Sequence, residues 1–218
     1  MKKYSIKNSF FLFIIFLIFY SIFYLYLKHD EGTDWSISEW LINYHGGFTR
    51  RGLGGEINIF LANFFSTSLR STIFFLQATI HSTYLILLLI YLKNLKLNIL
   101  QIFALFSPLF LLYPIAELEA LGRKEILIFT LFIVVIFFSK EKFHRNIVNL
   151  IVFIFFPFLC LIWEQVILFT PFFAVILINK NKLYSFLETS KKLLLIFSST
   201  IVVMTIVFVF PLSNEGHE

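Results

Sequence analysis

Long apolar runs separated by short polar segments dominate the chain. The clearest runs cover about residues 9–27, 72–92, 98–114, 126–139 and 193–211. A helix of about 20 apolar residues crosses the roughly 30 Å of hydrocarbon in a bilayer. The pattern therefore predicts an all-α fold, a polytopic transmembrane helix bundle.

The apolar stretch 147–178 contains one polar break, at Glu164-Gln165. Lysine and arginine clusters flank the stretch on both sides and both belong in the cytoplasm, so an even number of crossings must separate them. About 16 residues for each crossing cover only about 24 Å. We therefore expect two short helices that meet at Glu164, and about seven spans in total.

Residues 28–71 form the longest polar segment. A Ser-Ile-Ser-Glu capping box predicts a short amphipathic helix over 35–44, with Trp35 and Trp40 as anchors at the membrane interface. Apolar residues at helical spacing over 57–65 predict a second interfacial helix.

Charge fixes the expected orientation. Twelve basic residues fall in segments predicted to be cytoplasmic, against two acidic residues, Glu141 and Glu188. This asymmetry predicts a cytoplasmic N-terminus, an outer location for 28–71 and an extracytoplasmic C-terminus. We expect a single transmembrane domain over 1–218.

Composition excludes several classes. The chain is 59% hydrophobic with a mean hydropathy of +0.86, whereas soluble domains are roughly 45–50% apolar. The net charge of +5 is concentrated at the predicted cytoplasmic ends, so we expect the lipid bilayer as a partner and no nucleic acid. One cysteine, Cys160, allows no intrachain disulfide, and no histidine pair has metal-ligand spacing. We predict no metal and no cofactor, although the acidic outer face leaves a divalent cation open.

The segment from Tyr44 to Glu56 carries the first candidate chemistry. It holds five of the eight glycines, together with His45, Arg50 and Arg51. Glycines let a backbone approach a ligand closely, and paired arginines make forked hydrogen bonds to phosphate or carboxylate. Because basic residues are disfavoured in short outer loops, the segment predicts a site for phosphate or pyrophosphate.

Two further polar points are expected at the outer face. The first is the basic and acidic group Arg123, Lys124 and Glu125, which follows Gly122. The second is a set of carboxylates that could accept a proton from a hydroxyl nucleophile. The predicted catalytic residues are Asp30, Glu31 and Glu164, and the predicted phosphate- or substrate-binding residues are His45, Arg50, Arg51, Glu56, Arg123, Lys124 and Glu125.

Each point has a structural alternative. Arg50 and Arg51 could contact lipid headgroups or pair with Glu56, and residues 123–125 could form an ordinary loop. Glu164 could be an exposed turn residue, although a carboxylate between apolar helices is costly and usually functional.

Three motifs together resemble a family. The segment 43–56 is similar to a motif in the first outer loop of multispanning proteins, mostly uncharacterised, from bacterial capsule and O-antigen gene clusters. Residues 122–125 look like their second motif, Gly-Arg-Lys followed by an acid. Trp163-Glu164 and the run 169–173 are similar to a third, in which His stands where this chain has Trp163.

The resemblance covers roughly residues 9–178. It implies a polysaccharide polymerase or glycosyltransferase of the GT-C-like membrane type, located in the bacterial inner membrane. Its substrate would be a polyprenyl-linked glycan. Members usually have more than seven spans, so the chain could be the N-terminal part of a longer fold.

Two other functions stay open from the sequence. A transporter or lipid flippase would place polar residues along the spans, where only Gln77, His81 and Glu164 qualify. A non-catalytic membrane partner protein would tolerate replacement of the acids and arginines. The sequence does not define the sugar, the linkage, the acceptor or the oligomeric state.

Overall fold

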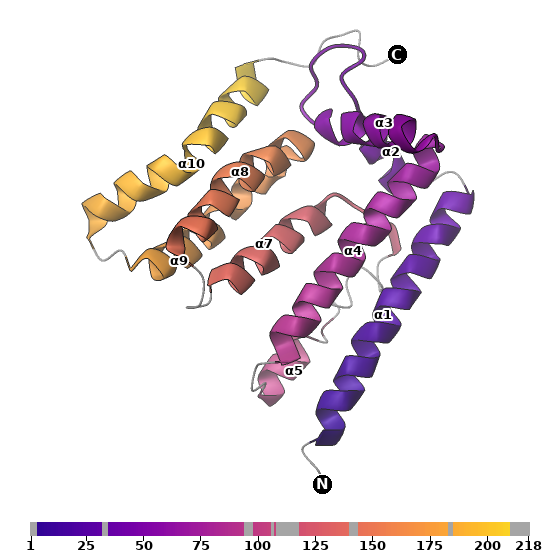
Figure 1. Cartoon of the computed structure of the whole chain (residues 1–218), viewed down its shortest axis with the longest axis horizontal. Helices are drawn as coiled ribbons and strands as arrows, with labels where there is room; N and C mark the ends of the chain where they lie inside the picture. Colours follow the sequence, from indigo (N-terminus) through magenta and orange to yellow (C-terminus); the bar gives the residue numbers. More distant parts are fainter. Residues whose placement is uncertain are drawn as a thin grey trace. The chain divides into compact units, whose positions relative to one another are not determined.

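A computed structural model of the chain describes residues 4–31, 35–93, 98–105, 107, 118–139, 144–182 and 185–209 (Figure 1). Within these ranges the regular structure is entirely helical. The α-helices are α1 (Tyr4–Glu31), α2 (Trp35–Leu41), α3 (Leu53–Phe65), α4 (Leu69–Lys93), α5 (Ile99–Leu105), α7 (Glu125–Ser139), α8 (Arg145–Ile162), α9 (Thr170–Asn181) and α10 (Phe186–Val209). Two 3-10 helices, η1 (Leu118–Ala120) and η2 (Glu164–Phe169), complete the set.

Several of these helices are suited to a bilayer. Among the described residues, four are long and apolar enough to cross: α1 through Phe11–Asp30, and the whole of α4, α8 and α10. The apolar helix α7 is shorter, at 15 residues. The helical membrane class is therefore supported, whereas the predicted count of about seven spans is not confirmed.

The predicted third span, 98–114, is described only in part. Its first residues form the seven-residue helix α5, and most of the remainder lies outside the described residues. In the segment 28–71, α2 and α3 occupy the regions where short helices are expected. Their location at a membrane interface stays a prediction.

The stretch 147–178 differs from expectation in one respect. α8 has 18 residues, about 27 Å at 1.5 Å per residue, so the prediction of two short helices is wrong for the first of them. Only α9, with 12 residues, is short. The chain leaves the helix at Trp163, whose backbone is extended at φ −155° and ψ 103°. α9 is short because the six residues of η2, Glu164–Phe169, lie between the end of α8 and its start.

The described chain divides into two compact units, Met1–Trp40 with Leu61–Ile126, and Leu41–Phe60 with Leu127–Glu218. In the first unit, α1 and α4 pack along their length (Figure 1). Buried residues recur every three or four positions on α1 at Ile14, Leu17, Ser21 and Leu25, which is the spacing of one helix face. Ser21 Oγ donates to the Leu17 carbonyl at 2.6 Å, so this buried hydroxyl is satisfied within the helix.

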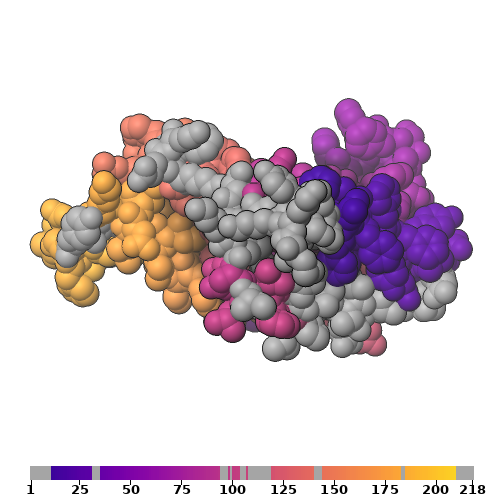
Figure 2. All heavy atoms as spheres, turned by 90° about the horizontal axis from the view of Figure 1, so that it is seen from below, coloured from indigo at the N-terminus to yellow at the C-terminus, as the bar shows by residue number. Residues whose placement is uncertain are grey.

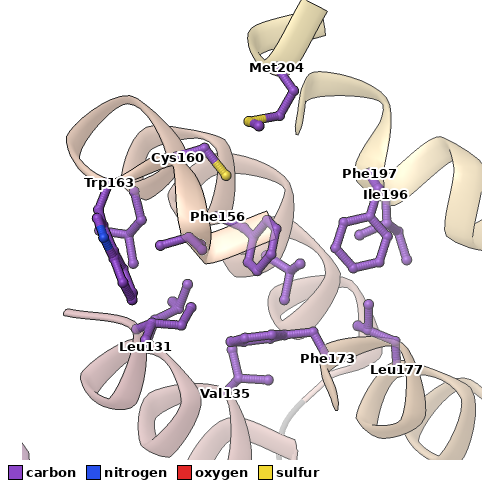
Figure 3. Packing of buried hydrophobic residues seen from close by; sticks show 14 of the residues in the cluster. Leu131, Val135, Phe156, Cys160, Trp163, Phe173, Leu177, Ile196, Phe197 and Met204 are labelled. Carbon is purple, nitrogen blue, oxygen red and sulfur yellow. The ribbon is translucent and has the colours of Figure 1, made fainter. Parts of the chain in front are cut away.

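The second unit is built around α8, which packs against α10, η2 and α9. Phe156 is fully buried at its centre (Figure 3). Its ring lies 5.1 Å from that of Phe173 and 5.5 Å from that of Phe197, both at steep interplanar angles. Such edge-to-face packing is favourable beyond the area it buries. Phe156 therefore joins three helices, α8, α9 and α10.

The outer surface of α10 is apolar. Leu194, Leu195, Ile201 and Val202 are all at least half exposed. In Figure 2 the orange and yellow atoms of α9 and α10 lie together at one face of the second unit. Exposed aliphatic side chains in this number are expected where a helix faces lipid.

Candidate functional site

The segment between α2 and α3 forms a compact turn, here called the arginine turn (residues 42–52). Backbone hydrogen bonds close it from Gly47 N to the Tyr44 carbonyl at 3.0 Å and from Gly55 N to the Ile42 carbonyl at 3.1 Å. Glu56 Oε1 accepts from Tyr44 N at 2.8 Å. The sequence predicts that Glu56 binds substrate. In the structure its carboxylate holds the start of the arginine turn against the first residues of α3, so the observed role of Glu56 is structural.

Glycine is required at the point where the turn approaches α3. A Cβ on Gly55 would lie 2.6 Å from the Ile42 carbonyl carbon and 2.9 Å from the Leu41 oxygen, both backbone atoms that cannot rotate away. Gly47 has a φ of 109°, a conformation that L side chains rarely adopt. These two glycines therefore shape the backbone that presents Arg50 and Arg51.

Arg51 is fixed by Glu164 in a two-point ion pair. Arg51 Nε donates to Glu164 Oε2 at 2.8 Å, and Arg51 Nη2 donates to Oε1 at 2.7 Å. The side chains are 32% and 22% exposed, respectively, so the pair is shielded but still reachable by solvent. Forked arginine–carboxylate contacts combine strength with a defined geometry. The contact ties the arginine turn to the break between α8 and η2.

Arg50 has a different environment. Its Nε is buried and meets no hydrogen-bond acceptor among the described residues. Its guanidinium carbon lies 5.9 Å from the centroid of the Phe208 ring, in the last turn of α10. An arginine over an aromatic ring gains about 0.5–1 kcal/mol at an exposed site, which does not replace the missing acceptor.

The electrostatics of the turn follow from these contacts. Burial raises the pKa of Glu164, but the Arg51 hydrogen bonds, a backbone hydrogen bond and the charges of Arg51 and Arg50 together lower it below its usual value. Glu164 is therefore ionised. Burial, followed by the nearby Glu56 charge, raises the pKa of Tyr44. Arg50, Arg51 and Glu164 carry one net positive charge, since two guanidinium groups face one carboxylate.

The second predicted group, residues 123–125, belongs to the first unit. Arg123 Nε lies 3.4 Å from Glu125 Oε1. Lys124 is only 1% exposed, and its Nζ lies 5.9 Å from the centroid of the Trp40 ring. This burial favours a packing role for Lys124, and phosphate binding by these residues stays a prediction.

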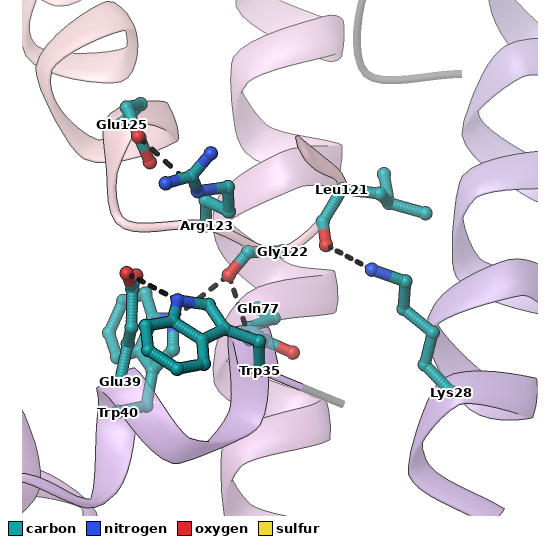
Figure 4. A network of polar contacts seen from close by, with 9 residues as sticks. All are labelled: Lys28, Trp35, Glu39, Trp40, Gln77, Leu121, Gly122, Arg123 and Glu125. Carbon is teal, nitrogen blue, oxygen red and sulfur yellow. Dashed lines mark hydrogen bonds and ion pairs between the residues drawn. The ribbon is translucent and has the colours of Figure 1, made fainter. Parts of the chain in front are cut away.

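The Gly122 carbonyl is the centre of the hydrogen bonds around the loop that leads into residues 123–125. Its oxygen accepts from Trp40 Nε1 at 2.9 Å and from Gln77 Nε2 at 2.8 Å (Figure 4). The neighbouring Leu121 carbonyl accepts from Lys28 Nζ at 3.1 Å. Two adjacent carbonyls thus tie the loop to α1, α2 and α4. In the sequence the only signal of this anchor was Gln77, a lone amide in an apolar run.

The remaining predicted residues are described only partly. Asp30 is exposed near the end of α1, and Glu31 is the last residue of that helix, with a side chain outside the description. His45 is exposed in the arginine turn, where its backbone N donates to Asn43 Oδ1 at 2.9 Å. Asp30 and Glu31 belong to the first unit, whereas His45 and Glu164 belong to the second.

The structure adds one residue that no sequence pattern singles out. Phe208 lies beside Arg50, but in the sequence it is one apolar residue in a long apolar run. Within the described ranges, no group of three or more histidine, cysteine, aspartate or glutamate side chains is arranged to hold a metal ion.

No protein-family model, curated protein or solved structure matches the chain. The likeness to the capsule and O-antigen cluster proteins therefore stays a prediction made from three motifs.

Proposed function

We propose that the chain is a membrane glycosyltransferase or polysaccharide polymerase that acts on polyprenyl-(pyro)phosphate-linked sugars. It would lie in a bacterial inner membrane with its N-terminus in the cytoplasm, so that the arginine turn faces outward. The observation that carries the proposal is the ion pair of Arg51 with Glu164. It holds Arg51, and with it the adjacent Arg50, on a glycine-shaped turn: only Arg51 contacts Glu164 directly, in a unit that contains two candidate membrane spans.

Sugar transfer from such a carrier has a simple charge requirement. An acceptor hydroxyl attacks the anomeric carbon, the bond from that carbon to the phosphate oxygen breaks, and the leaving phosphate takes the electron pair. Preorganised positive groups at the leaving oxygen lower the barrier, and the net positive charge of the arginine turn fits this role. The hydroxyl proton would pass to a carboxylate.

Glu164 is poorly suited to be that carboxylate. Both of its oxygens accept hydrogen bonds from Arg51, and its lowered pKa makes it a weaker base than a free glutamate. Its geometry supports a positioning role instead. Asp30 or Glu31 stays the base predicted from the sequence.

The proposal is tested by complementation in the native host. A strain that lacks the gene would be given the wild-type chain, Arg50→Ala or Arg51→Ala, and its surface polysaccharide would be sized on gels. We expect both variants to shorten or abolish the glycan at unchanged protein level. Arg70→Ala is the matched control, since Arg70 is exposed at the start of α4. Glycan of normal length in both turn variants would reject the proposal.

The alternatives make different predictions in the same experiment. A transporter or flippase role would depend on buried polar groups in the spans. Gln77 is one of these groups, but its amide is already engaged because it donates to the Gly122 carbonyl. A non-catalytic partner would retain function in both turn variants.

A further inference from the structure

The two adjacent arginines of the turn have unequal surroundings. Arg51 is committed to Glu164 through two charge-assisted hydrogen bonds. Arg50 has a buried Nε without an acceptor in the described part of the chain. A buried donor left without a partner costs about 1–3 kcal/mol, and more when it is charged. An incoming oxyanion that accepts from Arg50 would remove this cost, whereas binding at Arg51 would compete with Glu164.

The location of Arg50 indicates which anion it would meet. Its guanidinium lies over Phe208, one residue before the end of α10 at Val209, and α10 is long and apolar enough to span the bilayer. The end of a spanning helix lies at the depth of the lipid headgroups. Phosphoryl groups are the anions concentrated there, and arginine binds them with forked hydrogen bonds.

We propose that Arg50 is the direct ligand for one lipid-borne phosphoryl group, and that Arg51 with Glu164 acts as a positioning pair. The inference rests on the proposed function only for the identity of the lipid. Arg50, Arg51 and Glu164 together carry a net positive charge of one. This charge matches the single negative charge of one phosphoryl group in a diester linkage. The phosphoryl group could belong to a polyprenyl-linked donor or to a phospholipid of the bilayer, and the two sources are separated by experiment.

The test compares substitutions that keep the charge at each position. Wild type, Arg50→Lys and Arg51→Lys would be purified in a nonionic detergent, and binding of farnesyl pyrophosphate would be measured by isothermal titration calorimetry. Lysine retains a point charge but loses the arginine fork. We expect Arg50→Lys to weaken binding about tenfold, the equivalent of about 1.4 kcal/mol. Arg51→Lys should change it by less than about threefold, because a lysine can still pair with Glu164.

Two further measurements keep the result interpretable. Arg50→Ala should abolish binding, while the control Arg70→Ala should bind as wild type does. Melting temperatures in the same detergent would establish that each variant is folded. If Arg50→Ala does not fold, the comparison of the two lysine variants decides the question alone.

Phosphatidylglycerol in mixed micelles separates the two sources of phosphate. If it binds through Arg50 as tightly as farnesyl pyrophosphate does, the inference stands and the proposed function loses support. If farnesyl pyrophosphate binds at least tenfold more tightly, both stand. No binding of either ligand to wild type, or an Arg51→Lys loss equal to that of Arg50→Lys, would overturn the inference.

Discussion

Arg51 and Glu164 are 113 residues apart in the sequence and share two hydrogen bonds of 2.8 and 2.7 Å. The contact joins the turn before α3 to Glu164, the first residue of η2, which follows the extended residue Trp163 at the end of α8. It gives the glycine-rich segment a fixed attachment within its own unit. It also changes the interpretation of Glu164 from a candidate base to the partner of an arginine.

Loss of either member of this pair should destabilise the protein. Arg51→Ala removes both of these hydrogen bonds from the half-buried Glu164 carboxylate, and Glu164→Ala removes the same two bonds from the Arg51 guanidinium. We expect about 1–2 kcal/mol for each, between the values for surface and buried pairs. The double variant should cost less than the sum, which a double-mutant cycle by chemical denaturation would show. If the losses of stability in the two single variants add up to the loss in the double variant, the interaction between Arg51 and Glu164 contributes nothing to stability.

Stability should depend on pH through Glu164. Its pKa in the folded protein is lowered from the ordinary value of 4.5, so the ion pair contributes fully above that value and its contribution is lost as pH falls through the lowered pKa. We expect the difference in melting temperature between wild type and Glu164→Gln to be constant at neutral pH and to shrink as the pH falls below 4.5. A difference that grows on acidification would contradict this assignment.

Gly55→Ala should disrupt the arginine turn. The added Cβ would meet the Ile42 carbonyl carbon at 2.6 Å, and backbone atoms can move only by shifting the turn or α3. We expect a loss of about 2 kcal/mol or more, as for other overpacked sites. Gly46→Ala is the control, since Gly46 is exposed and its backbone does not have a positive φ. Equal melting temperatures for the two variants would show that the close approach is not required.

The Gly122 carbonyl should tolerate the loss of one donor better than the loss of two. Trp40→Phe removes the 2.9 Å hydrogen bond, and Gln77→Leu removes the 2.8 Å hydrogen bond. Each change should cost about 1 kcal/mol while the other donor remains. The double variant should cost more than their sum, because the buried carbonyl then has neither donor. Thermal unfolding of the four proteins in one detergent would measure this coupling.

The paired amides of Asn149 and Asn181 should contribute modestly to the packing of α8 on α9. Each amide donates to the other, at 3.2 and 2.9 Å. Hydrogen bonds between membrane helices average about 0.6 kcal/mol, so we expect Asn149→Leu to cost about that amount. Asn181→Leu should cost more, because Asn181 is buried and also donates to the Leu177 carbonyl at 2.8 Å. Unfolding midpoints would rank the two variants.

The sequence by itself determined the class of the fold. Apolar runs of spanning length can be stable only as helices in lipid, because every backbone polar group must be satisfied within the segment. The runs that became α1, α4 and α10 were therefore predicted, although α10 begins at Phe186, seven residues before the predicted start at 193. The break after α8 was also visible, because Glu164 and Gln165 interrupt an otherwise apolar stretch.

Only the tertiary structure decided which polar groups pair. Local spacing favours Arg50 or Arg51 with Glu56, yet Glu56 holds the Tyr44 backbone and Arg51 binds Glu164. Periodicity fixes which side chains share a helix face but carries no information on which helices meet. For the same reason, the sequence did not show that Lys124 is buried against Trp40 or that Phe208 lies beside Arg50. These pairings depend on how distant segments pack, which one-dimensional patterns do not encode.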